Sequence, residues 1–249
     1  MLRHTLRTKP QTHRAPFYQR TWFIPVTALA AFLLGLLTGY FGRPLVSPGP
    51  AGIDVVAPGT PGVDPGPGGN QEVMSYLIQE TRHFKGDASA PVVIIEFSDF
   101  KSPDCSTFSA GAGRQIRETY IAQGQVRLGY WHYVFLGPES QTAAEASECA
   151  ADQGAFWEYH DLIFALGAQG VPINIDSLKL IASEMGLDRG TFDACLDRGK
   201  YTDLVQQQTA LAQQLGIANT PAFMINAQAM LGVQPFESFQ QVIETQLAR

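Results

Sequence analysis

The sequence has few charges and few cysteines. Asp, Glu, Lys and Arg make up 16% of its 249 residues, against roughly 25% in a typical soluble domain, while hydrophobic residues reach an ordinary 45%. A wholly disordered chain is excluded, because such chains are rich in charge and poor in apolar residues. Three cysteines exclude a disulfide-dense miniprotein, and their odd number leaves at least one unpaired within the chain.

Positive charge is scarce overall and unevenly distributed. The formal net charge is -6, so the chain lacks a global basic field and we expect no nucleic-acid partner. Residues 1–43 carry six Lys or Arg and no acid, whereas residues 44–249 carry all 23 acids and a net charge of -12. This asymmetry indicates that the two parts of the chain work in different surroundings.

Residues 22–42 contain no charged side chain at all. As a helix they would span about 31 Å, close to the ~30 Å hydrocarbon core of a bilayer, with Trp22 and Tyr40 suited to its two interfaces. The basic residues in segment 1–21 mark the cytoplasmic side. We expect an uncleaved single-pass anchor in the cell membrane. The alternative is a cleaved signal peptide, which the long basic leader and long apolar run disfavour.

Between residues 44 and 70 the chain has seven prolines and seven glycines. Prolines and glycines are so frequent here that the segment shows no helical or strand periodicity. We therefore expect a tether that holds the next domain on the order of 30 Å from the membrane. The expected organisation is a cytoplasmic tail at 1–21, an anchor at 22–42, a linker at 43–70 and an extracytoplasmic folded domain at 71–249.

Hydrophobic periodicity in the folded domain predicts alternating strands and helices. Asn70 is expected to cap the first helix, and residues 91–100 form a β-branched run typical of a strand buried on both faces. Further elements are expected as a helix at 103–122, a strand at 126–135, helices throughout 138–216, strands at 222–226 and 228–231, and a last helix opened by Pro235. The predicted fold class is an α/β sheet domain with an all-helical insertion at about 138–216.

Several dispersed segments resemble the DsbA-like branch of thioredoxin-fold thiol-disulfide oxidoreductases. Residues 96–105 read EFSDFKSPDC, where the family has a similar segment ending in C-P-x-C. The further matches, in the family's order, are GD and APV within 86–92, GPES at 137–140, CAADQGAFWEYHD at 149–161 and GIANTPAFMIN at 216–226. The resemblance covers about residues 71–249. It implies a mixed sheet flanked by helices, no cofactor, and exported polypeptides or a membrane redox partner as the partners.

The sequence departs from the family at the centre of this motif. In the family the first cysteine is the exposed nucleophile at a helix N-terminus, whose dipole favours the thiolate. Here Ser102 stands at that position, and its oxygen cannot form a disulfide with a partner's sulfur. Cys105 matches the second, more buried cysteine, and Asp104 beside it disfavours a thiolate. Two-cysteine cycling is therefore impossible, and we interpret Ser102 as the helix N-cap before Pro103 rather than as a serine nucleophile.

Other family positions are retained. The resemblance identifies Glu96 with the buried carboxylate near the second cysteine; a Glu exposed at a sheet edge is the alternative. It likewise implies that Pro221 is the cis-proline and that Thr220 precedes it in a loop that binds substrate backbone; an ordinary trans turn is the alternative. Such a loop is compatible with peptide binding by strand addition even without redox chemistry.

Cys149 and Cys195 lie in the expected helical insertion, where some relatives carry a second, non-catalytic disulfide. We expect that disulfide here, with two buried free thiols or a redox or metal role as alternatives. Zinc is disfavoured because neither cysteine has a Cys or His at ligand spacing, so no metal is expected. His160 is interpreted as a packed helix histidine rather than a ligand.

Two hypotheses for function follow. The first is a membrane-anchored, extracytoplasmic member of the oxidoreductase family that exchanges thiols through Cys105 alone. The second is a redox-inactive module that holds exported polypeptides in a groove around Ser102 and Pro221.

Overall fold

A computed structural model describes residues 69–249. The expected tail, the anchor at 22–42 and nearly all of the linker lie outside the described residues. Within the described part of the chain, no helix is long and apolar enough to cross a membrane.

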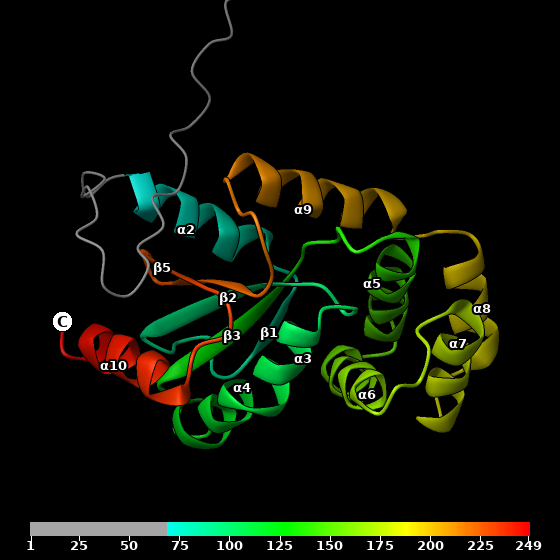
Figure 1. The fold of residues 1–249 in the computed structure, drawn as a ribbon, viewed down its shortest axis with the longest axis horizontal. Coiled ribbons are helices and arrows are strands. Elements are labelled where there is room, and N and C mark those ends of the chain that lie inside the picture. Colours follow the sequence, from blue (N-terminus) through cyan, green and yellow to red (C-terminus); the bar gives the residue numbers. More distant parts are fainter. Residues whose placement is uncertain (1–68) are drawn as a thin grey trace, which may run out of the picture. The chain divides into compact units, whose positions relative to one another are not determined.

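A five-stranded mixed sheet forms the centre of the domain, in the order β1-β3-β2-β4-β5 (Figure 1). β2 and β3 are parallel, and the other neighbouring pairs are antiparallel. Every residue of β2 is buried, as its continuous apolar run predicts for a central strand. The strands are β1 (His83–Lys85), β2 (Val92–Ser98), β3 (Val126–His132), β4 (Ala222–Ile225) and β5 (Gln228–Leu231).

Helices cover both faces of this sheet (Figure 1). Alternate residues of β2 point to opposite faces, so Val93 and Ile95 join one core cluster while Val92 and Ile94 join another. α2 and α9 cover the first face, and α3, α4 and α10 the second. Their bounds are α2 (Gly69–Glu80), α3 (Pro103–Ala110), α4 (Ala112–Ile116), α9 (Thr202–Gln214) and α10 (Phe236–Leu247).

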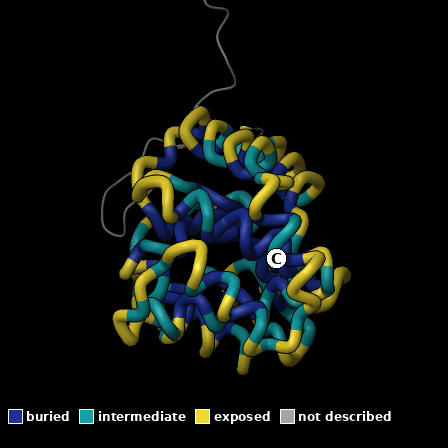
Figure 2. The backbone as a smooth tube through the Cα atoms, turned by 90° about the vertical axis from the view of Figure 1, so that its right-hand side faces the viewer, coloured by how far each residue is buried: buried dark blue, intermediate teal, exposed yellow. Residues whose placement is uncertain are grey.

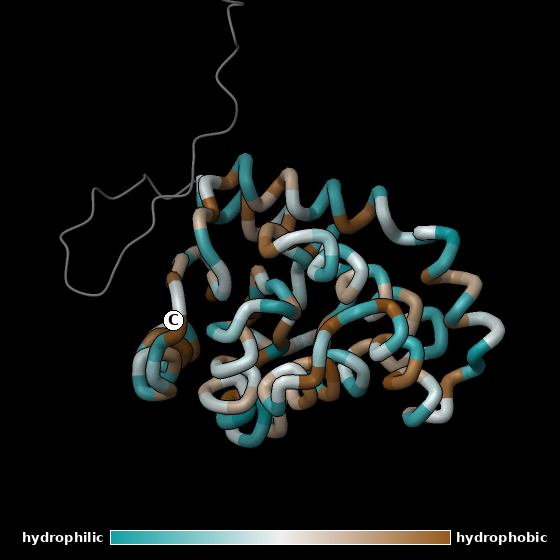
Figure 3. The backbone as a smooth tube through the Cα atoms, turned by 45° about the vertical axis from the view of Figure 1, so that its right-hand side comes forward, coloured by the Kyte–Doolittle hydropathy of each residue, from teal (hydrophilic) through white to brown (hydrophobic). Residues whose placement is uncertain are grey.

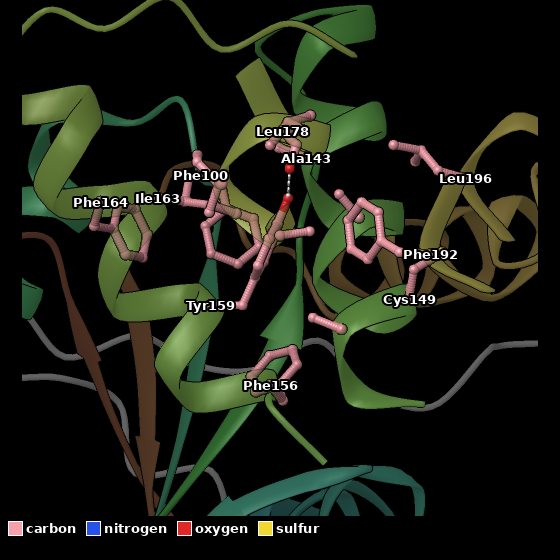
Figure 4. Packing of buried hydrophobic residues seen from close by; sticks show 14 of the residues in the cluster. Phe100, Ala143, Cys149, Phe156, Tyr159, Ile163, Phe164, Leu178, Phe192 and Leu196 are labelled. Carbon is pink, nitrogen blue, oxygen red and sulfur yellow. Dashed lines mark hydrogen bonds between the residues drawn. The ribbon is translucent and has the colours of Figure 1, made fainter. Parts of the chain in front are cut away.

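Four further helices pack beside one end of the sheet, around a core that also includes Phe100, Cys105 and Tyr130 (Figure 1). Tyr159 lies fully buried at its centre, and its hydroxyl donates a 2.8 Å hydrogen bond to the carbonyl of Leu178 (Figure 4). The helices are α5 (Pro138–Ala151), α6 (Phe156–Ala168), α7 (Ile175–Glu184) and α8 (Arg189–Asp197). The helical stretch expected at 138–216 thus divides, because α9 packs on the sheet through Ala212 and Leu215.

Burial and hydropathy follow these layers. The central strands β2, β3 and β4 are almost entirely buried, whereas the edge strands β1 and β5 are partly exposed. Buried segments lie inside the domain and exposed ones on its outside (Figure 2). Hydrophilic and hydrophobic residues alternate around the helical turns, which is typical of amphipathic helices over a core (Figure 3).

Some expected boundaries were wrong. Asn70 lies inside α2, and its side-chain amide donates to the Ala227 carbonyl instead of capping the helix. The helix expected at 103–122 is interrupted at Gly111, whose backbone is not helical, and ends in the π-helix η2 (Arg117–Ile121). β3 ends at His132, three residues early. The short edge strand β1 was not predicted, because three residues are too few for a periodic pattern.

Candidate functional site

The site is built where the chain leaves β2 and enters α3. Ser102 is extended and buried, and its Oγ accepts a 3.2 Å hydrogen bond from the backbone N–H of Cys105. Pro103 is the first residue of α3, where its missing N–H costs nothing. Asp104 follows in the exposed first turn, where a carboxylate complements the helix dipole. Ser102 thus has the geometry of an N-cap.

Cys105 lies in the first turn of α3, directly after the N-cap Ser102 and Pro103 and Asp104. Cys105 is unpaired and 0% exposed. Burial raises the pKa of its thiol, and the nearby Glu96 raises it further. The nearby hydroxyls of Ser102, Ser98 and Thr220 lower the pKa of the thiol in part without cancelling the effect of burial. The thiol therefore stays protonated near neutral pH and is shielded from solvent, which opposes rapid thiolate chemistry.

Glu96 lies on the same face of the sheet as this thiol. It is 1% exposed, so the edge-exposed alternative is wrong. Across the parallel pair its register partner is Tyr130, which is also buried. Burial raises the pKa of Glu96 to about 8, with a smaller opposing effect from the Ser98 hydroxyl. The carboxyl is therefore mostly neutral at pH 7 and is equipped to give or take a proton beside Cys105.

The loop before β4 completes the surroundings of the thiol. The peptide bond between Thr220 and Pro221 is cis. Thr220 is buried, and its hydroxyl is one of the three that affect the pKa of Cys105. Because β4 pairs with β2, the tertiary structure brings this loop from more than a hundred residues away to the start of α3.

Asp99 organises the loops around the site, a role that the sequence analysis did not assign. Its buried carboxylate accepts a 2.8 Å hydrogen bond from the backbone N–H of Lys101 and bonds of 3.1 and 3.2 Å from those of Phe135 and Leu136. The loop before α3 and the loop before α5 are thereby held together. The sequence signal for this role was the position of Asp99, a polar residue directly after a buried strand.

A second buried polar cluster lies beside the site, because His132 is the register partner of Ser98 and its ring centroid is 5.2 Å from that of Tyr130. Glu148 on α5 accepts hydrogen bonds from His132 at 3.0 Å, His83 at 2.8 Å and Arg82 at 3.0 Å. Burial alone would raise the pKa of Glu148, but the hydrogen bonds from the two histidines outweigh it and hold the pKa well below its usual range. The cluster fastens β1 and α5 to β3. Arg82 and His83 are adjacent in the sequence, but Glu148 lies 65 residues after His83, so no local pattern predicted the cluster.

The other two cysteines are paired with each other. A disulfide joins Cys149 on α5 to Cys195 on α8, as the resemblance implies. His160 is buried among aromatic rings, with its Nδ1 2.8 Å from Asp161 Oδ1, and burial lowers its pKa. Within residues 69–249, no cluster of three or more His, Cys, Asp or Glu residues is arranged to hold a metal ion.

A cavity of about 490 Å³ opens beside Ser102, between α3 and α6. Pro103 and Thr107 line it from α3, and Phe164 lines it from α6. The cavity therefore lies next to the N-cap of α3.

Chemically, the arrangement provides one protonated, buried thiol, a carboxyl whose pKa of about 8 lies near neutral pH, and a cavity beside the start of α3. It provides no second sulfur at the start of α3, because the Ser102 oxygen occupies that place. A disulfide between these two positions is therefore excluded.

Comparison with known proteins agrees with this fold. The sequence profile described as thioredoxin matches residues 79–245. The probable disulfide bond formation protein D of Bacillus anthracis is 28% identical over 184 residues, covering 72% of this chain and 82% of that protein. A Na⁺/H⁺ antiporter NhaA 3 of Salinispora tropica is 30% identical over 179 residues; the match covers 71% of this chain but spans only 26% of the antiporter's length.

Solved structures show the same architecture. Oxidised BdbD from Bacillus subtilis superposes with a TM-score of 0.63 at 24% identity, covering 69% of this chain and 95% of BdbD. Alpha-DsbA1 from Wolbachia pipientis gives a TM-score of 0.60 at 25% identity, covering 65% of this chain and 88% of that one. With its thioredoxin profile, its sheet order and its cis-proline loop, the chain belongs to the DsbA-like thioredoxin-fold family of thiol-disulfide oxidoreductases.

Proposed function

We propose that the chain is a membrane-anchored, extracytoplasmic DsbA-like protein that acts on exported polypeptides, with Cys105 as its only thiol for exchange. The observation that carries the proposal is the position of Cys105 in the first turn of α3, between Glu96 and the Thr220–Pro221 loop. These are the parts with which a thioredoxin fold receives a polypeptide and transfers a proton at sulfur. Ser102 removes the second sulfur and therefore limits the chemistry to one exchange step.

In that step the Cys105 thiol first loses its proton, for which Glu96 in its carboxylate form is the nearby acceptor. The thiolate then attacks one sulfur of a partner's disulfide. A new sulfur–sulfur bond forms, the old one breaks, and the second sulfur leaves as a thiolate that takes up a proton. Because the Cys105 thiol is buried, we expect this exchange to be slow and to require local opening of the N-terminus of α3.

A redox-inactive peptide-binding module is the second candidate, and the complete burial of Cys105 favours it. Insulin reduction and oxidation of a dithiol peptide separate the two candidates. If the wild type turns over insulin or the dithiol peptide, or forms a mixed disulfide, and Cys105→Ala does neither, thiol exchange is supported. Binding of an exported polypeptide that is equal in the wild type and in Cys105→Ala, with no thiol chemistry in either, supports the module.

The anchoring part of the proposal rests on the uncharged run at 22–42 behind a basic leader. Carbonate extraction of membranes and protease accessibility in spheroplasts test it. We expect the isolated protein to have the mass of the full-length chain. We also expect protease added outside the spheroplasts to digest the folded domain. Loss of the first forty-odd residues, or release by carbonate, would refute an uncleaved anchor.

A further inference from the structure

Two buried hydroxyl groups next to Glu96 have no use in the structure so far described. Glu96 Oε1, Ser98 Oγ and Tyr130 Oη are all buried, and within residues 69–249 none of them has a hydrogen-bond partner. Each of the three residues is 1% exposed. Buried polar atoms in native proteins are nearly always paired, so an unpaired carboxyl oxygen beside two unpaired hydroxyls indicates a state in which they do pair.

The sheet places these three side chains together. Glu96 and Ser98 lie two residues apart on β2 and therefore point to the same face. Tyr130 is the register partner of Glu96 on the parallel strand β3, about 5 Å away. The Ser98 hydroxyl lies close enough to lower the pKa of Glu96, of Tyr130 and of the Cys105 thiol. The carboxyl, the thiol and the two hydroxyls thus share one buried place.

The Tyr130 hydroxyl remains a donor over the whole range in which Glu96 titrates. Burial raises the pKa of Tyr130 well above its usual range, and the nearby Glu96 and Cys105 raise it further. A phenol or an alcohol supplies one O–H donor, whereas a carboxylate only accepts. A hydrogen bond to a charged acceptor is about twice as strong as one between neutral groups. The two hydroxyls are therefore suited to the ionised form of Glu96.

Charged groups on other elements face this place without taking over that task. Arg117 in η2 lowers the pKa of Glu96 and Asp161 on α6 raises it, both less than burial does. Asp99, after β2, raises the pKa of Tyr130. Its carboxylate already accepts three backbone N–H groups, so it does not compete for the phenol proton.

Two histidines are the other possible acceptors for the Tyr130 hydroxyl. The rings of His132 on β3 and His160 on α6 pack edge-on against the Tyr130 ring, with centroids 5.2 and 5.1 Å away. His132 Nδ1 and His160 Nε2 are buried and have no partner within the described residues. A neutral imidazole nitrogen is a weaker acceptor than a carboxylate, so the ionised Glu96 wins the phenol proton.

We propose that Tyr130 and Ser98 are positioning residues that donate hydrogen bonds to the Glu96 carboxylate and so prepare it to take the proton of the Cys105 thiol. In this step the proton moves from Sγ to a Glu96 oxygen, and the remaining thiolate forms the new sulfur–sulfur bond. Both hydroxyls keep their own protons throughout. The inference rests on the proposed function, which it deepens by naming the residues that regulate its thiol.

Infrared difference spectroscopy across a pH series tests the proposal. The C=O stretch of a protonated buried carboxyl reports the titration of Glu96, and its absence in Glu96→Gln assigns it. We expect the ionisation constant of Glu96 to fall by about tenfold in Tyr130→Phe, which removes only the hydroxyl, and to fall in Ser98→Ala as well. Tyr159→Phe is the matched control, because it removes another buried hydroxyl, bonded to Leu178, and should leave the titration unchanged.

Urea unfolding separates a positioning role from a merely structural one. At pH 5 Glu96 is neutral and the Tyr130 hydroxyl has no partner to lose, so Tyr130→Phe should be at least as stable as the wild type. Between pH 5 and pH 9 the variant should lose more stability than the wild type, because the pKa of its Glu96 is higher still. Tyr159→Phe loses its hydrogen bond and should be weakened equally at both pH values.

The exchange step supplies a third measurement. The rate at which Cys105 forms a mixed disulfide with glutathione disulfide should rise with the ionisation of Glu96, and this rise should move to higher pH in Tyr130→Phe. An unchanged Glu96 titration in Tyr130→Phe or in Ser98→Ala would overturn the role given to that hydroxyl. A shifted titration of His132 or His160 in NMR spectra of Tyr130→Phe, with Glu96 unchanged, would overturn it too.

Failure of this inference is distinguishable from failure of the proposed function. The Glu96 titration needs no partner disulfide, so it tests the inference even in a protein that exchanges no thiol. A shifted titration in Tyr130→Phe together with a wild type that never forms a mixed disulfide would contradict the proposed function alone. Exchange through Cys105 with an unchanged titration would contradict the inference alone.

Discussion

The backbone N–H of Cys105 donates a hydrogen bond to the Oγ of Ser102 at 3.2 Å. The residue that replaces a nucleophile in the family motif thus serves as the N-cap of the helix that carries the remaining thiol. Its oxygen stabilises the helix start, and its lack of sulfur leaves Cys105 with no partner there.

Ser102→Cys should restore disulfide exchange, because the variant places a second sulfur at the start of α3, where the helix dipole favours a thiolate. We expect insulin reduction well above the wild type. Ser102→Ala is the matched control, whose insulin reduction should not exceed that of the wild type and which should lose about 1 kcal/mol of stability with its cap. A folded Ser102→Cys protein without activity would show that the site is placed wrongly.

Thiol labelling of the native protein should be slow, because Cys105 is buried and its pKa is raised. Denaturation without reductant should expose one thiol, and denaturation with reductant should expose three. Mass spectrometry after alkylation counts them. Fast native labelling that disappears in Cys105→Ala would contradict the buried position.

Glu96→Gln should stabilise the protein increasingly as the pH rises. The pKa of Glu96 is about 8 in the folded state against an ordinary value of 4.5, so the folded state holds an extra proton between these values. Stability therefore falls as the pH rises through this window, by an amount on the order of a few kcal/mol. Urea unfolding of both proteins at pH 5 and pH 8 measures the difference. A difference that is the same at both pH values would refute the raised pKa.

Loss of the Cys149–Cys195 disulfide should lower the free energy of unfolding. The bond closes a loop with a sequence separation of 46, which the chain-entropy model values at about 4 kcal/mol. Urea unfolding of the Cys149→Ala, Cys195→Ala double variant measures the loss, with Cys105→Ala as the control that keeps the disulfide. An unchanged midpoint would mean that the bond does not constrain the unfolded chain.

The main elements could be predicted because their patterns are local. The run around Ile94 could only be a buried strand, and the motif ending in Cys105 indicated both the fold and its altered site. Boundaries were less certain where a tertiary contact decides them. β3 ends early because the amides of Phe135 and Leu136 bind Asp99 rather than a neighbouring strand. Asn70 leaves its expected capping role because the carbonyl of Ala227 lies within reach.

The sequence alone determined that the family motif at 102–105 holds one sulfur instead of two, because no fold changes the serine at position 102 into a cysteine. The pairing of the other two cysteines was decided by the structure. The sequence also determined the uncharged run at 22–42 and the order of strands and helices. Only the tertiary structure decided how the Cys105 thiol behaves. The burial of Cys105 and the neutral Glu96 arise from residues far apart in the chain. Their desolvation and mutual fields exist only once the sheet and its helices have packed together.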